Sequence, residues 1–166
     1  LAERCRMYAN HGALVKHQHR IEGINSRLDG LQAALLTRKL RHLDDWTRAR
    51  QRVAALYDRL LAGIPQVILP RVREGSTHVY HLYVIRAESR DARKAPLAAQ
   101  GIETGIHYPT ALPLLEAYAH LGMTAADIPR AARNQDAILS LPIYPEMTPE
   151  MVGYVADAIR GFYPTS

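Results

Sequence analysis

A helical pattern of unusual length occupies the middle of this 166-residue sequence. It begins at Asp29, whose side-chain oxygen can accept from the free N–H groups of a first helical turn. Apolar residues then recur at the three-and-four spacing of one helix face, at Leu31, Leu35, Leu43, Trp46, Val53, Leu56 and Leu60. Nothing breaks the pattern before Gly63-Ile64-Pro65, a standard helix stop. We therefore predict one helix over residues 29–63, roughly 50 Å long, which connects two packed bodies or carries a subunit interface.

A loop of small and polar residues, 23–27, leads into this helix. It presents Asn25, Ser26 and Arg27 at a helix N-terminus, where free N–H groups and the helix dipole favour negative charge. Two interpretations follow from the residues alone. The loop is either an anion site or an ordinary helix cap, and caps are far commoner.

Arginine makes the chain basic, with a formal net charge of +5 and a pI near 9.6. A basic surface fits nucleic acid, a membrane surface or a small phosphorylated ligand. The basic residues of the long helix are interrupted by Asp44 and Asp45 and scatter around it, and no DNA-binding motif is present. The pattern favours a solvated helix face over a nucleic-acid-binding module, so we expect no nucleic-acid partner.

Other features bear on the compartment and on metals. The single cysteine, Cys5, excludes an internal disulfide and fits a reducing compartment. No apolar run is long enough to cross a bilayer, and the N-terminus has no secretory h-region, so we expect a cytoplasmic protein with no membrane partner. His11, His17 and His19 lie close together, but no further residue completes a metal-ligand set. Because the sequence starts inside a helical pattern and without methionine, we also expect a fragment.

Strand and helix patterns alternate after Gly63. We predict strands at 66–69, 79–86 and 102–108, and helices at 89–100, 114–121, 128–139 and from Thr148. The strand 79–86 (VYHLYVIR) is apolar on both faces, so we expect it to be central and covered on both sides, with His81 in the core. The sum predicts a β-α-β unit closed by helices, an α/β or α+β small domain over residues 64–166.

Several stretches together resemble the C-terminal part of the DegT/StrS family of pyridoxal-phosphate (PLP) sugar aminotransferases. They are HG at 11–12, GINSRLDGLQAALLTRKL at 23–40, LDDW at 43–46, VYHLYVIR at 79–86, GIETGIHYP at 101–109, AYAHLG at 117–122 and LSLPIYPEMT at 139–148. The resemblance covers essentially the whole chain. It implies the C-terminal part of a fold type I aminotransferase: the end of the large domain with an active-site loop (1–28), a long inter-domain helix (29–63) and a small α/β domain (64–166).

The resemblance also implies a chemistry. Members of the family transfer an amino group, usually from glutamate, to a keto sugar attached to a nucleoside diphosphate, and they work as homodimers. The Schiff-base lysine that carries PLP lies upstream of the region matched here, and Lys16, Lys39 and Lys94 do not stand in its motif. We therefore expect no catalytic lysine in this chain and no activity of the chain alone.

Five residues carry expected binding roles by resemblance. Asn25 of the NSR motif corresponds to the asparagine that reaches across the dimer to the PLP phosphate. Arg27 is suited to phosphate or carboxylate, with an ion pair to Asp29 or Asp45 as the alternative. His19 lies at a position near the sugar nucleotide, and His107 and Tyr108 lie on the substrate side of the cleft.

Two departures from the family pattern are visible. The aromatic residue common just before His19 is replaced by His17 and Gln18, and the loop 110–114 (TALPL) lacks a histidine that relatives often carry after the proline. Two alternatives to the enzyme remain: a lysine-less regulatory or sugar-nucleotide-binding paralogue and, less favoured, the nucleic-acid-binding module.

Overall fold

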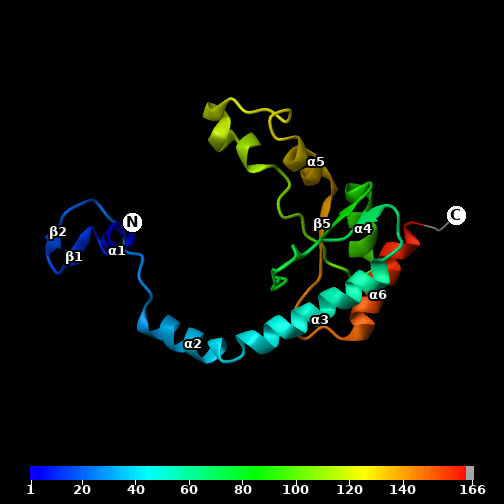
Figure 1. The fold of residues 1–166 in the computed structure, drawn as a ribbon, viewed down its shortest axis with the longest axis horizontal. Helices are drawn as coiled ribbons and strands as arrows, with labels where there is room; N and C mark the ends of the chain where they lie inside the picture. Colours follow the sequence, from blue (N-terminus) through cyan, green and yellow to red (C-terminus); the bar gives the residue numbers. More distant parts are fainter. Residues whose placement is uncertain (164–166) are drawn as a thin grey trace. The chain divides into compact units, whose positions relative to one another are not determined.

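The computed structural model describes residues 1–163, which form two compact units, one of residues 1–43 and one from Asp44 onward (Figure 1). The first unit contains α1 (Ala2–Ala9), β1 (Ala13–Val15), β2 (Gln18–His19) and α2 (Gly30–Leu40). The second is built from α3 (Leu43–Leu61), β3 (Val67–Ile68), β4 (Tyr83–Ala87), α4 (Arg90–Ala99), α5 (Pro129–Ala137), β5 (Ile138–Leu141) and α6 (Pro149–Gly161). Within residues 1–163, no helix combines the length and apolar character needed to cross a membrane.

The predicted continuous helix over residues 29–63 is wrong, because the chain forms α2 and α3 with a turn at residues 41–42 between them. The charges around the turn explain the break. Arg38 and Lys39 occupy the last turn of α2, and Asp44 and Asp45 occupy the first turn of α3. Basic residues suit a helix C-terminus and acidic residues an N-terminus. The charged residues therefore mark the end of one helix and the start of the next, although the apolar spacing shows no break. The role of residues 29–63 as an inter-domain connector stays a prediction.

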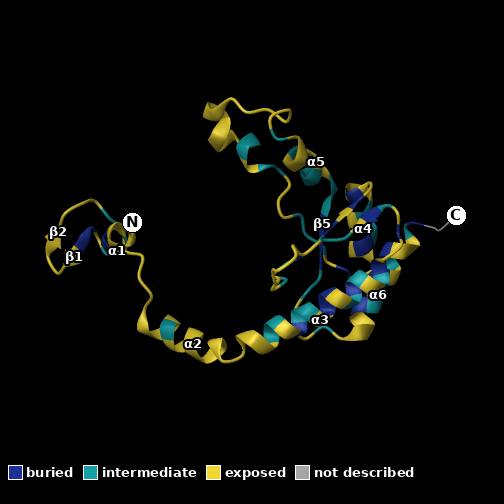
Figure 2. Cartoon of the chain, viewed as in Figure 1, coloured by how far each residue is buried: buried dark blue, intermediate teal, exposed yellow. Residues whose placement is uncertain are grey.

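The apolar face of α2 is exposed (Figure 2). Leu31 is 74% exposed, Leu35 58% and Leu40 66%. An apolar stripe of this kind marks an interface, since single soluble proteins rarely expose one. We expect the isolated chain to self-associate in sedimentation velocity, and Leu31→Gln with Leu35→Gln to reduce that association. Arg38→Gln, on the same helix, serves as the control; a parent chain that sediments as a folded monomer at high concentration contradicts the prediction.

The sheet of the second unit is antiparallel, in the order β3-β4-β5. The expected central position of the VYHLYVIR strand is therefore confirmed, with Tyr83 opposite Leu141 and Ile85 opposite Leu139. Tyr83, Ile85 and Ala87 are buried on one face of β4, whereas Arg86 on the other face is exposed. One face of β4 is therefore covered, and not both as predicted. The α+β form of the fold class is confirmed, but the β-α-β unit is not formed.

Three local predictions need correction. Residues 102–108 form an isolated bridge between Gly105 and Ser140 and no strand. The helix 128–139 ends at Ala137, because Ile138 and Leu139 pair with β4, and this pairing overrides the helical spacing. The helix 114–121 is two short 3₁₀ turns, Leu112–Leu114 and Glu116–Leu121.

Helices α3, α4 and α6 cover the buried face of this sheet in one apolar core. Its largest fully buried side chains are Tyr57, Tyr83, Leu61, Ile85, Leu97, Leu139 and Val152. The Tyr57 and Tyr83 rings stack with centroids 5.0 Å apart. The Tyr83 hydroxyl donates to Asp58 (2.6 Å); burial first, and then this bond, raise the pKa of Tyr83. The Tyr57 hydroxyl donates to the Pro142 carbonyl (3.0 Å), so both tyrosines keep a satisfied polar end in the core.

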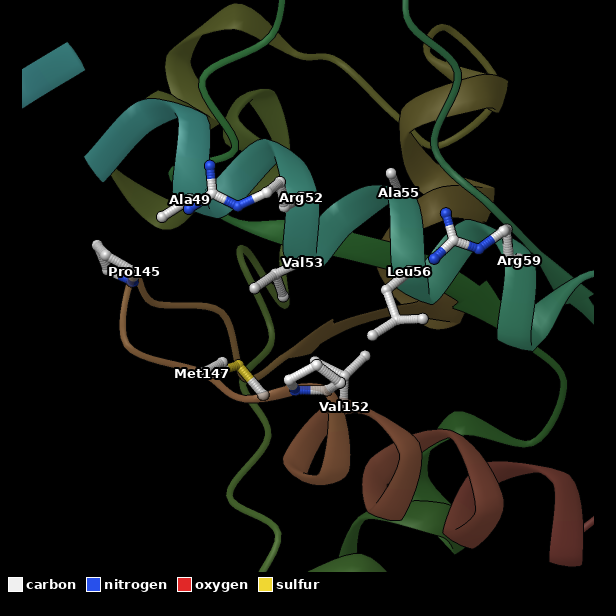
Figure 3. Close-up of a pocket in the computed structure, with 10 residues that line it drawn as sticks. Ala49, Arg52, Val53, Ala55, Leu56, Arg59, Pro145, Met147 and Val152 are labelled. Carbon is white, nitrogen blue, oxygen red and sulfur yellow. The ribbon is translucent and has the colours of Figure 1, made fainter. Parts of the chain in front are cut away.

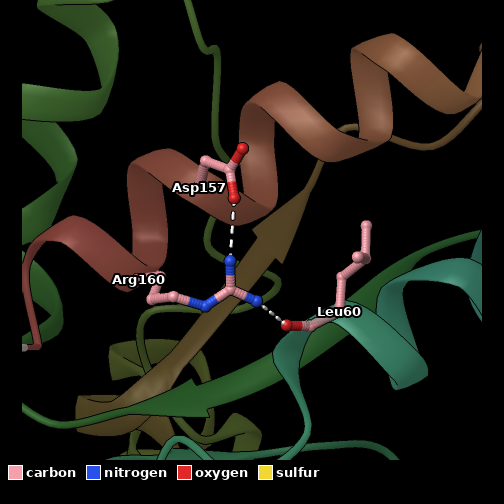
Figure 4. Close-up of polar contacts among 3 residues, drawn as sticks. All are labelled: Leu60, Asp157 and Arg160. Atoms are coloured by element: carbon pink, nitrogen blue, oxygen red, sulfur yellow. Dashed lines mark hydrogen bonds and ion pairs between the residues drawn. The ribbon is translucent and has the colours of Figure 1, made fainter. Parts of the chain in front are cut away.

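Arg160 ties the end of α6 to the end of α3 (Figure 4). Its guanidinium donates to the Leu60 carbonyl, one of the last-turn carbonyls of α3, and to Asp157 (2.8 Å). We expect Arg160→Ala to lower the free energy of unfolding by about 1 kcal/mol, measured by urea denaturation. Arg59→Ala, also in the last turn of α3, is the matched control. Equal denaturation midpoints for the two variants would show that the Leu60 bond does not stabilise the fold.

Candidate functional site

Residues 24–26 are fixed to the end of α1 by backbone hydrogen bonds. The Ile24 N–H donates to the Tyr8 carbonyl (2.8 Å), and the His11 N–H donates to the Ile24 carbonyl (3.0 Å). The Ser26 N–H donates to the Ala9 carbonyl (2.9 Å), and Asn25 pairs with Asn10 in an isolated bridge. The NSR motif therefore lies on a defined backbone although it belongs to no helix or strand.

Two glycines permit this arrangement. A Cβ on Gly12 would lie 1.7 Å from the Ile21 carbonyl oxygen, and the φ of Gly12 is +77°, which favours glycine. A Cβ on Gly23 would lie 2.2 Å from the Gly12 nitrogen. The segments around residues 12, 21 and 23 thus approach too closely for any side chain. The spacing of Gly12 from Gly23 in the sequence carries no signal of this contact.

Asn25 and Arg27 contact each other. The Arg27 Nε donates to the Asn25 Oδ1 (3.1 Å), which leaves the Asn25 amide NH2 and the remaining guanidinium N–H groups as donors on an exposed loop. The alternative ion pair of Arg27 with Asp29, the acid in the same unit, is not formed within residues 1–163. Asp45 pairs with Arg48 (2.5 Å), and Asp29 accepts from the Gln32 N–H (2.9 Å).

Asp29 is an ordinary N-cap of α2, as expected from its position. Its carboxylate takes the N–H group of Gln32 that an anion would otherwise use. An anion at this loop would therefore bind through the Asn25 and Arg27 side chains. A neutral amide donor and a cationic guanidinium side by side suit a phosphate dianion, so the residues present fit the PLP phosphate.

His19 lies in β2 with its ring fixed to the chain. Its Nδ1 is 2.7 Å from the His11 carbonyl oxygen, and because a carbonyl only accepts, Nδ1 is the donor. The Nε2 atom is therefore the ring nitrogen left for a ligand. Among residues 1–163, no three His, Cys, Asp or Glu side chains gather in a way that could hold a metal ion.

His107 lies in the second unit beside β5. Its Nδ1 is 2.8 Å from the Ser140 hydroxyl, and the exposed Tyr108 ring meets it edge-on with centroids 5.7 Å apart. A cleft of about 590 Å³ adjoins this pair, lined among others by His81, Glu103, Thr104, His107, Ser140 and Tyr144. His81, predicted in the core, is exposed and lines the cleft because β4 begins only at Tyr83. Ser140 was missed, since a serine within an apolar strand carries no functional signal by itself.

A second groove, of about 420 Å³, lies between α3, the segment 145–149 and α6 (Figure 3). Val53, Leu56, Met147 and Val152 give it an apolar floor, and Arg52 and Arg59 line it as well. None of the predicted site residues lines it.

Two of the basic residues of α3, Arg48 and Arg50, are engaged within the second unit. Arg48 pairs with Asp45, whereas the Arg50 Nη1 donates to the Ile143 carbonyl (2.8 Å) and, at longer range, to the Tyr80 and His81 carbonyls. Their charges are used within the unit, which weakens the case for a nucleic-acid-binding face.

The arrangement can be compared with known proteins. The profile of the DegT/DnrJ/EryC1/StrS aminotransferase family matches residues 1–160. This chain belongs to that family. Family members similar to it include a dTDP-3-amino-3,4,6-trideoxy-alpha-D-glucose transaminase of Streptomyces venezuelae, 42% identical over 96% of this chain and 42% of the relative. A pleiotropic regulatory protein of Geobacillus stearothermophilus is 44% identical over 98% of this chain and 44% of the relative.

Solved structures of the family agree with the fold. A crystal structure of S. venezuelae DesV in complex with a ketimine intermediate superposes with a TM-score of 0.91 at 39% identity. The superposition includes 99% of this chain and 44% of the DesV chain. A DegT DnrJ EryC1 StrS aminotransferase from Brucella abortus gives 0.86 at 34% identity. The chain thus spans less than half the length of these family members.

Proposed function

We propose that this chain is the C-terminal portion of a PLP-dependent aminotransferase that acts on a nucleotide-linked keto sugar. Glutamate serves as the amino donor, in deoxyamino-sugar or surface-polysaccharide biosynthesis in the cytoplasm. The observation that carries the proposal is the combination of 42% identity to a dTDP-sugar transaminase with a TM-score of 0.91 to DesV. Family membership alone would leave the substrate class open.

In this proposal PLP supplies the electron sink for amino transfer, and the chain's own residues bind and orient. Asn25, with its Oδ1 held by Arg27, donates its amide N–H to the cofactor phosphate of the neighbouring subunit in a homodimer. Arg27 adds a cation beside it. His19 presents Nε2 to the sugar nucleotide. His107 contacts the substrate from the cleft of the second unit, and the exposed Tyr108 contacts it from beside His107.

The catalytic lysine comes from outside this chain. Lys16, Lys39 and Lys94 are all exposed, whereas a lysine that binds PLP covalently needs a shielded site that activates its amine. We expect the isolated chain, mixed with PLP and reduced with borohydride, to show no stoichiometric label on one lysine by mass spectrometry. A specific, complete label would overturn this assignment.

The decisive experiment uses the complete protein that contains this segment. Incubated with PLP, glutamate and a 3-keto dTDP- or UDP-sugar, it should release 2-oxoglutarate and give the aminated nucleotide sugar, detected by mass spectrometry. Absence of both products across these substrates would overturn the proposal.

A second candidate is a regulatory paralogue that binds a nucleotide sugar without catalysis. The similarity to a relative called a pleiotropic regulatory protein favours it. It predicts nucleotide-sugar binding by calorimetry together with no amino transfer, which is the opposite outcome of the assay above.

A further inference from the structure

We propose that Ser140 is a positioning residue, which holds the His107 imidazole against Gly105 so that Nε2 is the ring nitrogen presented to the substrate. The proposal rests on the proposed function, in which His107 contacts the nucleotide-linked sugar. It adds the residues that set the orientation of that ring. The cleft beside His107 would then recognise a hydroxyl or carbonyl oxygen of the sugar.

Three hydrogen bonds join Ser140 to the segment 105–107. The Ser140 N–H donates to the Gly105 carbonyl (2.8 Å), and the Gly105 N–H donates to the Ser140 carbonyl (3.1 Å). The Ser140 hydroxyl bonds the His107 Nδ1 at 2.8 Å. Ser140 itself is 4% exposed and belongs to β5, the strand paired with the central β4. The ring is thus attached to the sheet of the second unit.

Gly105 supplies the space that the ring occupies. A Cβ at this position would lie 2.5 Å from the His107 Cε1 and 3.1 Å from its Nδ1. Real Cβ contacts are not this short, so the imidazole lies directly over the glycine backbone. Packing against Gly105 and the hydrogen bond from Nδ1 to the Ser140 hydroxyl together fix the orientation of the ring. A well-defined binding site requires such fixed side chains.

The chemistry of serine suits this task. A hydroxyl both donates and accepts, so Ser140 can keep its bond to Nδ1 in either tautomer of a neutral histidine. The Nε2 atom then accepts from a sugar hydroxyl or donates to a sugar oxygen, according to the tautomer. A carboxylate at this place would only accept and would select the tautomer with a proton on Nδ1, whereas serine bonds the ring in either tautomer.

The Ser140 hydroxyl has no other evident task. The Ser140 backbone already pairs with Gly105, and its strand neighbours Leu139 and Leu141 belong to the apolar core while Ser140 lines the cleft. The same cleft contains a second polar group, the Thr104 Oγ1, which is buried and has no hydrogen-bond partner among residues 1–163. Buried polar groups are normally paired, so we expect a polar ligand in the cleft to supply the partner that the Thr104 hydroxyl lacks.

The test uses the complete protein and the variants Ser140→Ala, His107→Ala and their combination. Loss of the Ser140 bond should raise the KM for the nucleotide sugar about threefold to tenfold, with the KM for glutamate unchanged. In the His107→Ala background, Ser140→Ala should add nothing, because Ser140 acts through the ring. Gly105→Ala, which keeps the hydroxyl but displaces the ring, should reproduce the Ser140→Ala effect.

A second measurement does not depend on turnover. In protein labelled with 15N-histidine, the His107 ring resonances, assigned from the His107→Ala spectrum, should shift in Ser140→Ala and not in Ser26→Ala. Unchanged ring resonances, or an equal rise in KM in the presence and absence of His107, would reduce Ser140 to a structural residue and overturn the proposal. If the parent protein transfers no amino group, the proposed function fails, while the NMR result still decides whether Ser140 holds the ring.

Discussion

Replacing Asn25 by alanine in the complete protein should weaken PLP retention about tenfold to a hundredfold. A hydrogen bond to a charged group contributes about 1.5–3 kcal/mol, and 1.4 kcal/mol corresponds to about a factor of ten in affinity. The structure sharpens the reason, because the Asn25 Oδ1 is used by Arg27 and the amide NH2 remains to donate. Equilibrium dialysis against PLP, followed by the cofactor's absorbance, measures the change.

A second substitution separates a direct contact from an effect through Arg27. Asn25→Asp keeps an oxygen for Arg27 but removes the amide donor and places a negative charge near the phosphate. It should lose PLP at least as readily as Asn25→Ala. Ser26→Ala, whose backbone bond to Ala9 is retained, should keep its cofactor. Parent-like retention by Asn25→Asp would exclude the direct contact.

Mixed dimers test whether the contact crosses the subunit interface. A dimer of one Asn25→Ala subunit and one lysine-less subunit should recover one working site, because the lysine-less subunit supplies Asn25 to its neighbour. If such dimers stay inactive while Asn25→Ala homodimers work, the assignment across the interface is wrong.

Gly12→Ala should have the larger effect on the same loop. A Cβ there would lie 1.7 Å from the Ile21 carbonyl oxygen, and the left-handed backbone adds about 1–2 kcal/mol for a residue with a side chain. The backbone must move, and Asn25 moves with it, since residues 24–26 are bonded to the same turn. We expect PLP retention to fall at least as far as in Asn25→Ala, together with a lower urea midpoint for the transition of residues 1–43.

Gly30→Ala is the matched control. Gly30 is the first residue of α2, and a Cβ there would meet no atom within 4 Å. Alanine is also the better helix former, so stability should hold or rise slightly and cofactor retention should not change. Equal behaviour of Gly12→Ala and Gly30→Ala would contradict the close approach at Gly12.

The sequence predicted those features that depend on neighbouring residues alone, such as helix caps, helix faces and strand propensity. Asp29 and Thr148 stand where the sequence predicted helix starts, and each side chain accepts from the N–H three residues on. Val152, Val155 and Ile159 recur at helical spacing and are buried in α6, the helix that the sequence predicted from Thr148. The strand around Ile85 was found because aromatic and β-branched residues concentrate there.

Features set by distant contacts were missed. Ile138 and Leu139 fit a helix by spacing, and only pairing with β4 assigns them to a strand. The binding roles of Asn25, Arg27, His19, His107 and Tyr108 were predicted from family resemblance and stay predictions. The resemblance did not indicate their hydrogen-bond and ring partners. Ser140 is far from His107 in the sequence, and the contact of Gly12 with Ile21 follows from how the chain crosses itself. No residue type or spacing records either contact.

Arg50 has a further consequence for how the protein's charge should be understood. Its guanidinium donates to three backbone carbonyls, those of Tyr80, His81 and Ile143. A cation held this way works as a cross-link between chain segments and is not free to exchange its partners for a mobile polyanion. The formal charge of +5 therefore overstates the attraction that a cation-exchange resin or a nucleic acid would feel, since counterion release depends on cations that can reach the phosphates.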